Sequence, residues 1–385
     1  DKKVLNVPPL RFPEFKGEWE KSELGSLVSN KCLKYTPSSN EHLLDIELDS
    51  IESNNGICSK FYDSSTQKSV KNCFNSQNVL YGKLRPYLNK WYLPKQNGVC
   101  SSEIWVLSSK ALKRTFLYGL IQGKSFKSGS NVSSGSKMPR ADWNYIESIP
   151  VNFPGDEEQE RIGQFVMLVE KRIEVQRKII EDITLQKKSI RSRCFNLENG
   201  PFANQRWALE PISSFLEEQK NKQDCPDGNR LITVRLKQEG VVKNSNFGNL
   251  KLGETQYYTR HVGEFIYGKQ NLFNGAFGIV PLRLDGYSSS GDVPSFSFKG
   301  NINPIFFLEL IATEYKKMEK YSTGTGSKRI HENQFLSFNI PVPNESVQNK
   351  IVCVLVSLSK KEELEKKSLS LMESAKSYLL SALFC

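Results

Sequence analysis

The sequence predicts an α+β fold in which two globular domains, related by a pseudo-two-fold axis, are separated by two long antiparallel coiled-coil helices. Three observations predict this fold. The chain has 385 residues, more than one ordinary core accommodates. A long amphipathic helix occupies its middle, and the second half repeats the first in order. The predicted boundaries are 1–155 for the first domain with an N-terminal arm, 156–197 for the central helix, 198–343 for the second domain and 344–385 for the C-terminal helix.

The central helix is predicted by its apolar spacing and by the absence of Pro and Gly after Gly163. Apolar residues recur at alternating steps of three and four, which is the spacing of a coiled-coil seam. The seam comprises Ile162, Val166, Val169, Ile173, Ile180, Ile183 and Ile190, with Gln176 and Lys187 at the two remaining positions. Acidic residues crowd the first turns and basic residues the last, as the helix dipole favours. Asp156 is expected to be the N-cap, with Gln159 completing a capping box.

The second half of the chain echoes the first at offsets of 186 to 191 residues. The echoes occur in the same order in both halves, which a chance match does not produce. They pair Trp19, Leu24 and Leu27 with Trp207, Ile212 and Phe215; Tyr81-Gly82-Lys83 with Tyr267-Gly268-Lys269; Ser101–Glu103 loosely with Ser288–Asp292; Gly135-Ser136-Lys137 with Gly326-Ser327-Lys328; Ile149-Pro150-Val151 with Ile340-Pro341-Val342; and Gln159 with Gln348. The repeating unit is therefore a whole domain together with its helix.

The repeat also predicts the partner of the central helix. Residues 345–383 form a second long helix whose seam comprises Leu355, Leu358, Leu369, Met372 and Leu379. Lys376 recurs at the position of Lys187, whereas Glu362 and Glu365 weaken the middle of this seam. One amphipathic helix of this length cannot bury its apolar stripe alone, so the two helices are expected to pack against each other. An antiparallel arrangement follows from the pseudo-two-fold relation.

Within the first domain, short β-type runs alternate with Ser, Asn and Gly turns from Cys32 to about Leu107. The clearest strands are Asn78–Lys83 and Val99–Leu107, and Ala111–Gln122 is predicted to be helical. Trp19, Leu24 and Leu27 have the spacing of a short helix that opens the domain. Ser125–Arg140 is predicted to be a basic loop rich in Gly and Ser.

The composition and the motifs argue against an enzyme. No nucleotide-binding glycine loop, zinc-binding His pair or nucleophile elbow is present, and the three histidines lie far apart in sequence. The eight cysteines form no Cys-x-x-Cys pair, so neither a metal site nor a disulfide framework is expected. We therefore predict no catalytic and no metal-binding residues. With no apolar run of about 18 residues and no signal peptide, a cytoplasmic protein without membrane contact is expected.

The formal net charge of +11 favours an anionic partner, and nucleic acid is the best candidate. Basic and amide residues lie among Gly, Ser and aromatic residues in the parts that repeat, where they can follow a phosphate backbone or reach base edges. The candidate DNA-binding residues are Lys83, Arg85, Lys90, Lys127, Asn131, Lys137 and Arg140 in the first half and Lys269, Gln270, Asn271, Lys328 and Arg329 in the second, with Arg235, Lys237 and Arg260 as weaker candidates. The alternative for any single one is an ordinary solvated loop position.

The helices and the segments leading into them resemble a known family. Residues 157–190 strongly resemble the central helix of specificity subunits of type I restriction-modification enzymes, and Arg11–Leu27 resembles their N-terminal opening. The strings SIPVNFPGDEEQ and NIPVPNESVQ resemble the family's linker into each helix. The second copy departs from the pattern, because Val347 precedes Gln348 where a Glu is usual. The resemblance covers the whole chain in organisation but is weak inside the two domains.

The resemblance implies a chain without catalytic activity whose two target recognition domains each read one half of a bipartite, asymmetric DNA target. It implies double-stranded DNA and two methyltransferase subunits as partners, with two restriction subunits in the full complex. No cofactor would be bound by this chain; S-adenosylmethionine would belong to the methyltransferase subunits, and ATP and Mg²⁺ to the restriction subunits. The helices would set the unread gap and dock the methyltransferase subunits, with Arg172, Arg177 and Arg191 as candidate contacts. The alternatives are a stand-alone two-domain DNA-binding or scaffold protein without methyltransferase partners, and an enzyme with an unrecognised site.

Overall fold

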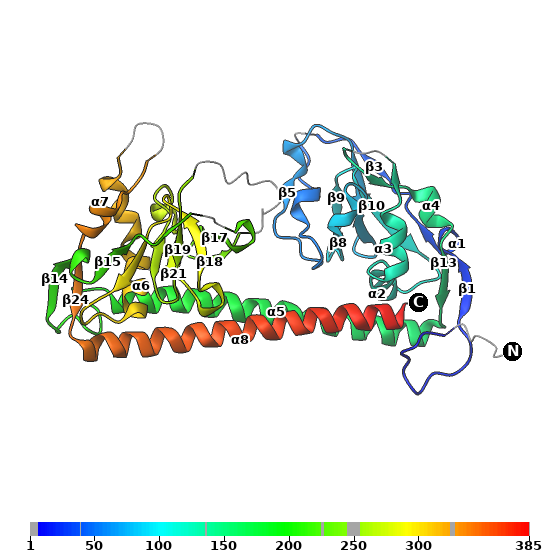
Figure 1. Ribbon diagram of the computed structural model, residues 1–385. Helices are drawn as coiled ribbons and strands as arrows, with labels where there is room; N and C mark the ends of the chain where they lie inside the picture. The colour runs from blue at the N-terminus through cyan, green and yellow to red at the C-terminus, as the bar shows by residue number, and fades with distance from the viewer. Residues whose placement is uncertain are drawn as a thin grey trace. The chain divides into compact units, whose positions relative to one another are not determined.

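The computed structural model describes residues 7–38, 40–134, 137–224, 227–244, 255–323 and 328–384 (Figure 1). The chain divides into two compact units. Unit 1 comprises Asp1–Lys178 and Lys366–Cys385, and unit 2 comprises Ile179–Glu365. Each unit therefore holds one globular domain and one part of each long helix. Most of the predicted N-terminal arm, Asp1–Asn6, lies outside the described residues.

The globular part of unit 1 is built mainly on two larger sheets. The strands are β1 (Glu20–Glu23), β2 (Val28–Ser29), β3 (Lys34–Tyr35), β4 (Leu44–Ile46), β5 (Tyr62–Asp63), β6 (Lys71–Phe74), β7 (Val79–Gly82), β8 (Trp91–Tyr92), β9 (Gly98–Cys100), β10 (Ile104–Ser109), β11 (Ser133–Ser134), β12 (Arg140–Ala141) and β13 (Pro150–Phe153). The short helices are α1 (Leu24–Leu27), α2 (Arg114–Leu120), α3 (Lys124–Ser130) and α4 (Trp143–Glu147). One sheet has the order β2-β10-β7-β8 and the other the order β3-β6-β9-β4-β5.

The globular part of unit 2 repeats the first of these sheets. Its strands are β14 (Trp207–Pro211), β15 (Leu216–Gln219), β16 (Lys222–Gln223), β17 (Ile232–Arg235), β18 (Gly240–Lys243), β19 (Tyr257–Arg260), β20 (Phe265–Tyr267), β21 (Phe277–Ile279), β22 (Tyr287–Ser290), β23 (Ser295–Phe298) and β24 (Asn339–Pro343). Its short helices are α6 (Pro304–Glu314) and α7 (Glu332–Leu336). The order β15-β23-β20-β21 matches β2-β10-β7-β8 strand for strand. The repeat predicted from the sequence is thus a repeat of topology.

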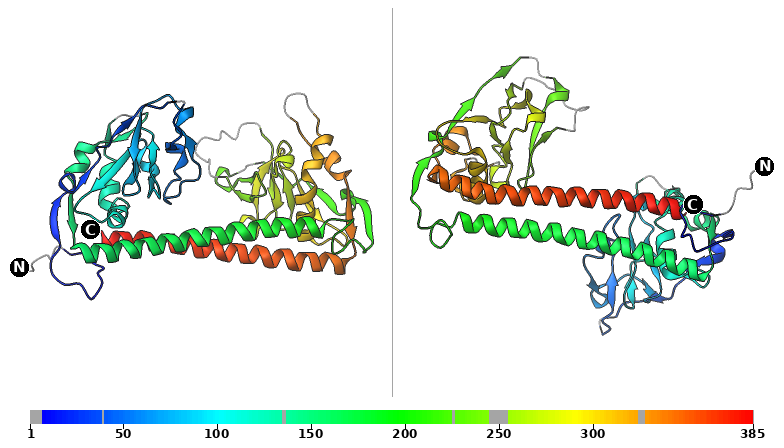
Figure 2. Two further views of the ribbon diagram at one scale, coloured as in Figure 1. Left: turned by 180° about the vertical axis from the view of Figure 1, so that it is seen from behind. Right: turned by 90° about the horizontal axis from the view of Figure 1, so that it is seen from below.

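The two long helices begin within one residue of the predicted starts, 156 and 344, and end two or three residues before the predicted ends, 197 and 385. Helix α5 runs from Asp156 to Cys194 and α8 from Glu345 to Leu383, 39 residues each, which corresponds to about 58 Å at 1.5 Å per residue. All twelve predicted apolar seam residues are buried or half-buried. An apolar seam of this length needs a facing helix, and α5 and α8 lie side by side within each unit (Figure 2).

The helices are antiparallel within each unit. In unit 1, Glu170 of α5 accepts from Lys376 at 2.6 Å, and about two helical turns further along α5 Arg177 donates to Glu373 at 2.6 Å. As the residue numbers rise along α5, the residue numbers of its contacts on α8 therefore fall. In unit 2, Thr184 donates to Glu362 at 3.3 Å, and Ile190 further along α5 packs in the cluster that contains Leu355 and Ile351. The seam lysine at 376 is thus neutralised inside the helix pair, with its side chain only 11% exposed.

The segment that opens each domain is a strand, so the predicted short helix through Trp19, Leu24 and Leu27 is wrong over most of its length. Strand β1 pairs antiparallel with β13, and a single helical turn, α1, follows it. Strand β14 likewise pairs antiparallel with β24, with Ala208 opposite Val342. The partner strand lies more than 120 residues away, so local spacing could not reveal it.

The predicted loop Ser125–Arg140 is also partly wrong. Its first part is helix α3, which buries Phe126 against Tyr81 with ring centroids 5.0 Å apart. Phe126 is the one large apolar residue between Ser125 and Asn131, and its burial in the domain core is what holds this Gly- and Ser-rich segment in a helix. Gly135 and Ser136 lie outside the described residues, as do Gly326 and Ser327 of the second basic loop.

The predicted capping box at the start of α5 is wrong in a way that identifies a structural role for Gln159. This side chain is 1% exposed and does not reach back to Asp156. Its amide oxygen accepts from the backbone N–H of Lys113 at 2.8 Å, and its amide nitrogen donates to the carbonyls of Pro154 at 2.9 Å and Ala111 at 3.2 Å. It therefore ties the helix to the segment preceding α2 and to its own linker.

Gln348 makes the same three contacts in unit 2. Its amide oxygen accepts from the N–H of Asn303 at 2.8 Å, and its nitrogen donates to the carbonyls of Pro343 at 3.0 Å and Asn301 at 3.1 Å. The repeated Gln of the linker is thus a buried clamp between each long helix and its domain.

The residue before this Gln explains why the second copy departs from the pattern. Glu158 is 4% exposed, and both of its carboxylate oxygens accept from Arg11, at 2.7 and 2.8 Å. In the second copy the position of Arg11 is occupied by Asn199 at the offset of 188, and Val347, 4% exposed, packs in the apolar core of unit 2. The arginine and the glutamate are therefore absent from the second copy together.

Candidate nucleic-acid interface

The first group of candidate residues gathers where β7 ends. Strand β7 is fully buried, so the chain leaves the core at Lys83. The N–H of Lys83 donates to the carbonyl of Glu103, and its own carbonyl accepts from the N–H of Ala141, both at 2.9 Å. Two residues on, Arg85 adopts a left-handed backbone conformation (φ 53°) and its N–H donates to the carbonyl of Pro139 at 2.7 Å. These backbone contacts bring Lys83, Arg85 and the segment around Arg140 together.

A carboxylate that sequence analysis missed joins this group. Arg140 donates to both oxygens of Glu103, with Nε–Oε2 at 3.0 Å and Nη2–Oε1 at 2.8 Å. Hydrogen bonding from Arg140 lowers the pKa of the Glu103 carboxyl. The side chains are 46% and 26% exposed, so the pair faces solvent.

The second group occupies the equivalent place in unit 2. The N–H of Lys269 donates to the carbonyl of Asp292, and its carbonyl accepts from the N–H of Ile330, both at 2.9 Å. Arg329 donates to the carboxylate of Asp292 at 3.1 Å. With its amide oxygen turned toward Arg329, Gln270 accepts from that guanidinium at 2.6 and 3.2 Å.

The two groups differ in the residues that surround their lysines. Lys269 forms an ion pair with Glu332 at 2.7 Å, and both side chains are largely buried. At an offset of 189, Trp143 occupies the position of Glu332 in the first domain. The sequence signal for Glu103 and Asp292 was the loose echo of Ser101–Glu103 in Ser288–Asp292. Nothing in the sequence singled out Glu332.

The remaining candidates lie in different surroundings. Lys90 points inward and donates to the carbonyl of Leu48 at 2.7 Å, and burial lowers its pKa. Lys127 lies over the ring of Trp91 at 5.1 Å, and its pKa is lowered by burial and by the charge of Lys376. Lys127 therefore faces the long helices of unit 1, and the structure does not bring it to Lys83 and Arg140.

Four candidates are surface or turn residues. Asn131 is exposed at the end of α3 and donates to the carbonyl of Lys127 at 2.9 Å, and Lys137 is exposed. Asn271 accepts from Asn274 at 3.1 Å within a turn, and Lys328 forms an exposed ion pair with Glu319 at 2.8 Å.

The weaker candidate Arg260 is an internal residue. It is 1% exposed and donates to Ser289 and Ser295 and to the carbonyls of Gln219 and Val293, so it cannot contact a nucleic acid from this position. Burial lowers its pKa to about 10.

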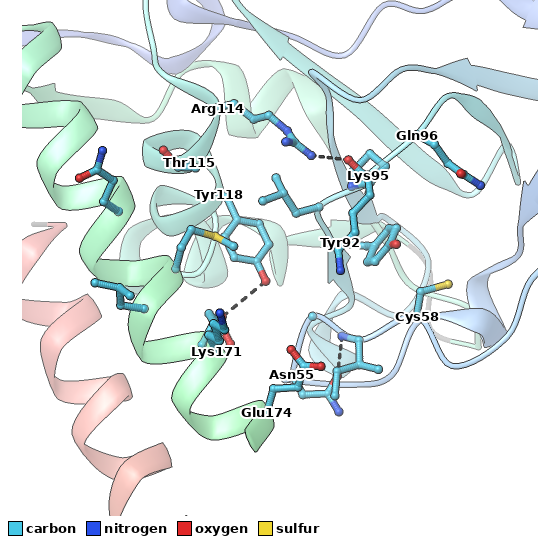
Figure 3. Close-up of a pocket in the computed structure, with 18 of the residues that line it drawn as sticks. Asn55, Cys58, Tyr92, Lys95, Gln96, Arg114, Thr115, Tyr118, Lys171 and Glu174 are labelled. Carbon is cyan, nitrogen blue, oxygen red and sulfur yellow. Dashed lines mark hydrogen bonds between the residues drawn. The ribbon is translucent and has the colours of Figure 1, made fainter. Parts of the chain in front are cut away.

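A pocket of about 1160 Å³ lies in unit 1, between the globular domain and α5 (Figure 3). Tyr118 from α2 and Lys171 and Glu174 from α5 lie on one side of it, and Cys58 and Tyr92 on the other. Burial raises the pKa of Cys58 to about 11, so this thiol is not an activated nucleophile. None of the candidate DNA-binding residues lines the pocket.

The described residues offer no constellation suited to catalysis by histidine. His42 contacts Asp63 at 2.7 Å on the surface of unit 1, and His261 lies 3.4 Å from Asp285 on the surface of unit 2. His331 caps α7. Across the described ranges, no three His, Cys, Asp or Glu side chains form a cluster that could hold a metal ion. Among the helices in the described part of the chain, none combines the length and apolarity that crossing a membrane requires.

Comparison with known proteins agrees with this geometry. A family model described as "Type I restriction modification DNA specificity domain" matches residues 16–185 and 219–373, one match in each half of the chain. A segment of 95 residues is 30% identical to the type I restriction enzyme EcoDI specificity subunit of Escherichia coli. That segment covers 24% of this chain and 21% of the relative, so the match spans about a fifth of the relative's length.

Two solved structures share the fold over nearly the whole chain. A specificity subunit of a type I restriction-modification system from M. genitalium aligns with a TM-score of 0.58 at 15% identity, covering 98% of this chain and 99% of that one. A chain from a structural study of complex assembly and conformational transition in a type I system aligns with a TM-score of 0.59 at 14% identity, covering 94% and 96%. With family matches across both halves, the chain belongs to the type I restriction-modification DNA specificity family, whose members are recognition subunits and not catalytic ones.

Proposed function

We propose that this chain is the sequence-reading subunit of a type I restriction-modification complex, in which each globular domain reads one half of a bipartite, asymmetric DNA target. The observation that carries the proposal is the double occurrence of one arrangement. Lys83, Glu103 and Arg140 in unit 1 correspond to Lys269, Asp292 and Arg329 in unit 2, with the same backbone hydrogen bonds. Because the residues around the two groups differ, the two half-sites differ as well.

The proposed partition follows from this function. Residues 1–155 and 198–343 are the two target recognition domains, and residues 156–197 and 344–385 are the spacer helices. The net charge of +11 supplies a sequence-independent attraction to phosphates. Arg140, Arg329 and Gln270 supply donors and acceptors that match base edges in the major groove. Lys83, Arg85, Lys137 and Lys328 are proposed as backbone contacts, because lysine donors and a backbone-anchored arginine can follow phosphates without reading bases.

The partners are proposed to be double-stranded DNA, two methyltransferase subunits and, in the full complex, two restriction subunits. S-adenosylmethionine belongs to the methyltransferase subunits, and ATP and Mg²⁺ belong to the restriction subunits. The outer faces of the helices support docking. In unit 1, Leu371 and Tyr378 of α8 stand one heptad apart and are 64% and 70% exposed, and Val175 of α5 is 47% exposed. Apolar rows on otherwise polar helices are suited to a partner helix.

The arginines considered for docking divide into two kinds. Arg177 and Arg191 form ion pairs within the chain, with Glu373 at 2.6 Å and Glu309 at 2.5 Å. Arg172 is exposed. Of the three, Arg172 is therefore the docking contact that we propose to keep.

Mapping methylated adenines in cells that carry the complete complex tests the proposal. We expect a split motif with two unlike halves and a fixed gap. Binding by the chain alone, compared with binding by the chain together with methyltransferase subunits, separates the alternative. Tight, specific binding by the isolated chain would favour a stand-alone DNA-binding protein. Replacing all three histidines together tests the enzyme alternative, and we expect DNA recognition to persist.

A further inference from the structure

We propose that Glu103 and Asp292 are specificity-determining residues, each holding one arginine in an exposed ion pair that is exchanged for a guanine only in the correct half-site. The inference rests on the proposed function and extends it from the basic residues to the carboxylates beside them. Arg140 and Arg329 are the two guanidinium groups concerned.

The equivalence of the two ion pairs rests on three separate contacts. In each domain a Lys follows the buried central strand of the four-stranded sheet, and its N–H donates to the carbonyl of the residue that carries the carboxylate. In each domain the carbonyl of that Lys accepts from the residue that follows the arginine, Ala141 or Ile330. In each domain the arginine then bonds the carboxylate. Surface ion pairs formed by chance would not recur with the same backbone scaffold.

The exposure of the two pairs makes the exchange favourable. The side chains are 46% and 26% exposed for Arg140 and Glu103, and 39% and 55% exposed for Arg329 and Asp292. An exposed ion pair contributes less than about a fivefold change in an equilibrium constant. A bidentate contact between Arg and the O6 and N7 of guanine discriminates by about fivefold to a hundredfold. The arginine therefore gains by leaving the carboxylate for a guanine.

At a wrong base the same arrangement acts in the opposite direction. The arginine has no second acceptor to replace the carboxylate, and the carboxylate stands where it repels neighbouring phosphates. The carboxylate thus weakens binding to unrelated DNA more than binding to the target. It also fixes the planar guanidinium in place before DNA arrives, which reduces the ordering cost of the base contact.

The two domains differ in the number of charged side chains around this ion pair. The first combines two cations, Lys83 and Arg140, with one carboxylate. The second combines two cations, Lys269 and Arg329, with the two carboxylates of Asp292 and Glu332. Binding at the first half-site should therefore depend more steeply on salt than binding at the second, because counterion release scales with the cations that meet phosphates.

The test uses the full chain in complex with its methyltransferase subunits. Glu103→Gln and Asp292→Asn remove one carboxylate charge each while keeping the side-chain shape. Arg140→Lys keeps the positive charge but loses the paired donors. Asp49→Asn is the matched control, since Asp49 forms an exposed ion pair in the same domain with Lys60, at 2.5 Å, and not with an arginine. Binding is measured on the mapped target, on targets with single changes in either half, and on a duplex of random sequence.

We expect Glu103→Gln to raise affinity for random DNA about threefold to tenfold and to lower discrimination at the first half-site at least fivefold, with the second half-site unaffected. Asp292→Asn should do the same at the second half-site only. Arg140→Lys should weaken target binding about tenfold with little effect on random DNA, and Asp49→Asn should leave discrimination unchanged.

Unchanged discrimination in Glu103→Gln and Asp292→Asn, or an equal loss at both half-sites from either variant, would overturn the inference. These results are distinct from failure of the proposed function, because that failure would appear in the wild-type complex as the absence of any split target.

Discussion

Replacing Gln159 with Leu should destabilise unit 1 by removing a buried clamp. The change keeps the side-chain volume but leaves one N–H and two carbonyls without their partner at a position only 1% exposed. Orphaned buried backbone groups cost about 1–3 kcal/mol each, and the costs do not add fully because the backbone relaxes. We therefore expect a loss of about 3 kcal/mol in the free energy of local unfolding.

Hydrogen exchange at the backbone N–H of Lys113 is the assay, because this N–H donates directly to the Gln159 side chain. A loss of about 3 kcal/mol corresponds to exchange about a hundredfold faster. Gln348→Leu should act in the same way on the N–H of Asn303 in unit 2. Gln164→Leu is the control, since Gln164 is an exposed residue of the same helix. Wild-type exchange at Lys113 in Gln159→Leu, with an unchanged denaturation midpoint, would refute the reasoning.

Three further predictions concern the helices and the interface. Inserting four residues at Thr184 lengthens α5 by about 6 Å. Mapped methylation should then show a longer gap between the two half-sites, with both half-site sequences unchanged. A changed half-site with the original gap would contradict the spacer role. Arg191→Ala should lower the unfolding free energy of unit 2 by about 3 kcal/mol in denaturant titrations, because Glu309, 7% exposed, loses its 2.5 Å partner; a midpoint within error of wild type would count against this. Arg140→Ala should raise the pKa of Glu103 toward its ordinary value in an NMR titration. A carboxyl whose pKa is lowered by folding stabilises the protein above its unfolded pKa and loses this contribution as the pH falls through its folded value, so the variant should lose less stability on acidification than the wild type does.

The long helices were predictable because their signal is local. Helical hydrogen bonds join residues four apart, and the seam of α5 and α8 is written in steps of three and four along one stretch of chain. The start of each domain was not predictable in the same way. Trp19 and Leu24 fit a helical spacing, but the strand between them is fixed by β13, far along the chain. The same limit applies to α3, whose helix depends on the burial of Phe126 in the core.

The interface was predictable in its basic residues and not in their partners. The repeat drew attention to Lys83 and Lys269, but Arg140 meets Glu103 only because Lys83, after the end of β7, hydrogen-bonds the segments at the starts of β10 and β12. Sequence also assigns no direction to a side chain, which is why Lys127 was grouped with the loop cations although it lies over Trp91. Gln159 shows a further limit, since the same residue type fits a helix cap and a buried tertiary clamp.

Unit 1 is assembled from two segments that are far apart in the sequence, and this has a consequence for biosynthesis. Its core contains Phe384, which is 4% exposed and packs on Phe116 with ring centroids 5.2 Å apart. The carbonyl of Ala382 accepts from the N–H of Leu10 at 3.2 Å. A ribosome makes these residues only after all of unit 2, so the unit that begins first is completed last. Until then its apolar core stays open, and this nascent domain is a natural client for chaperones during translation.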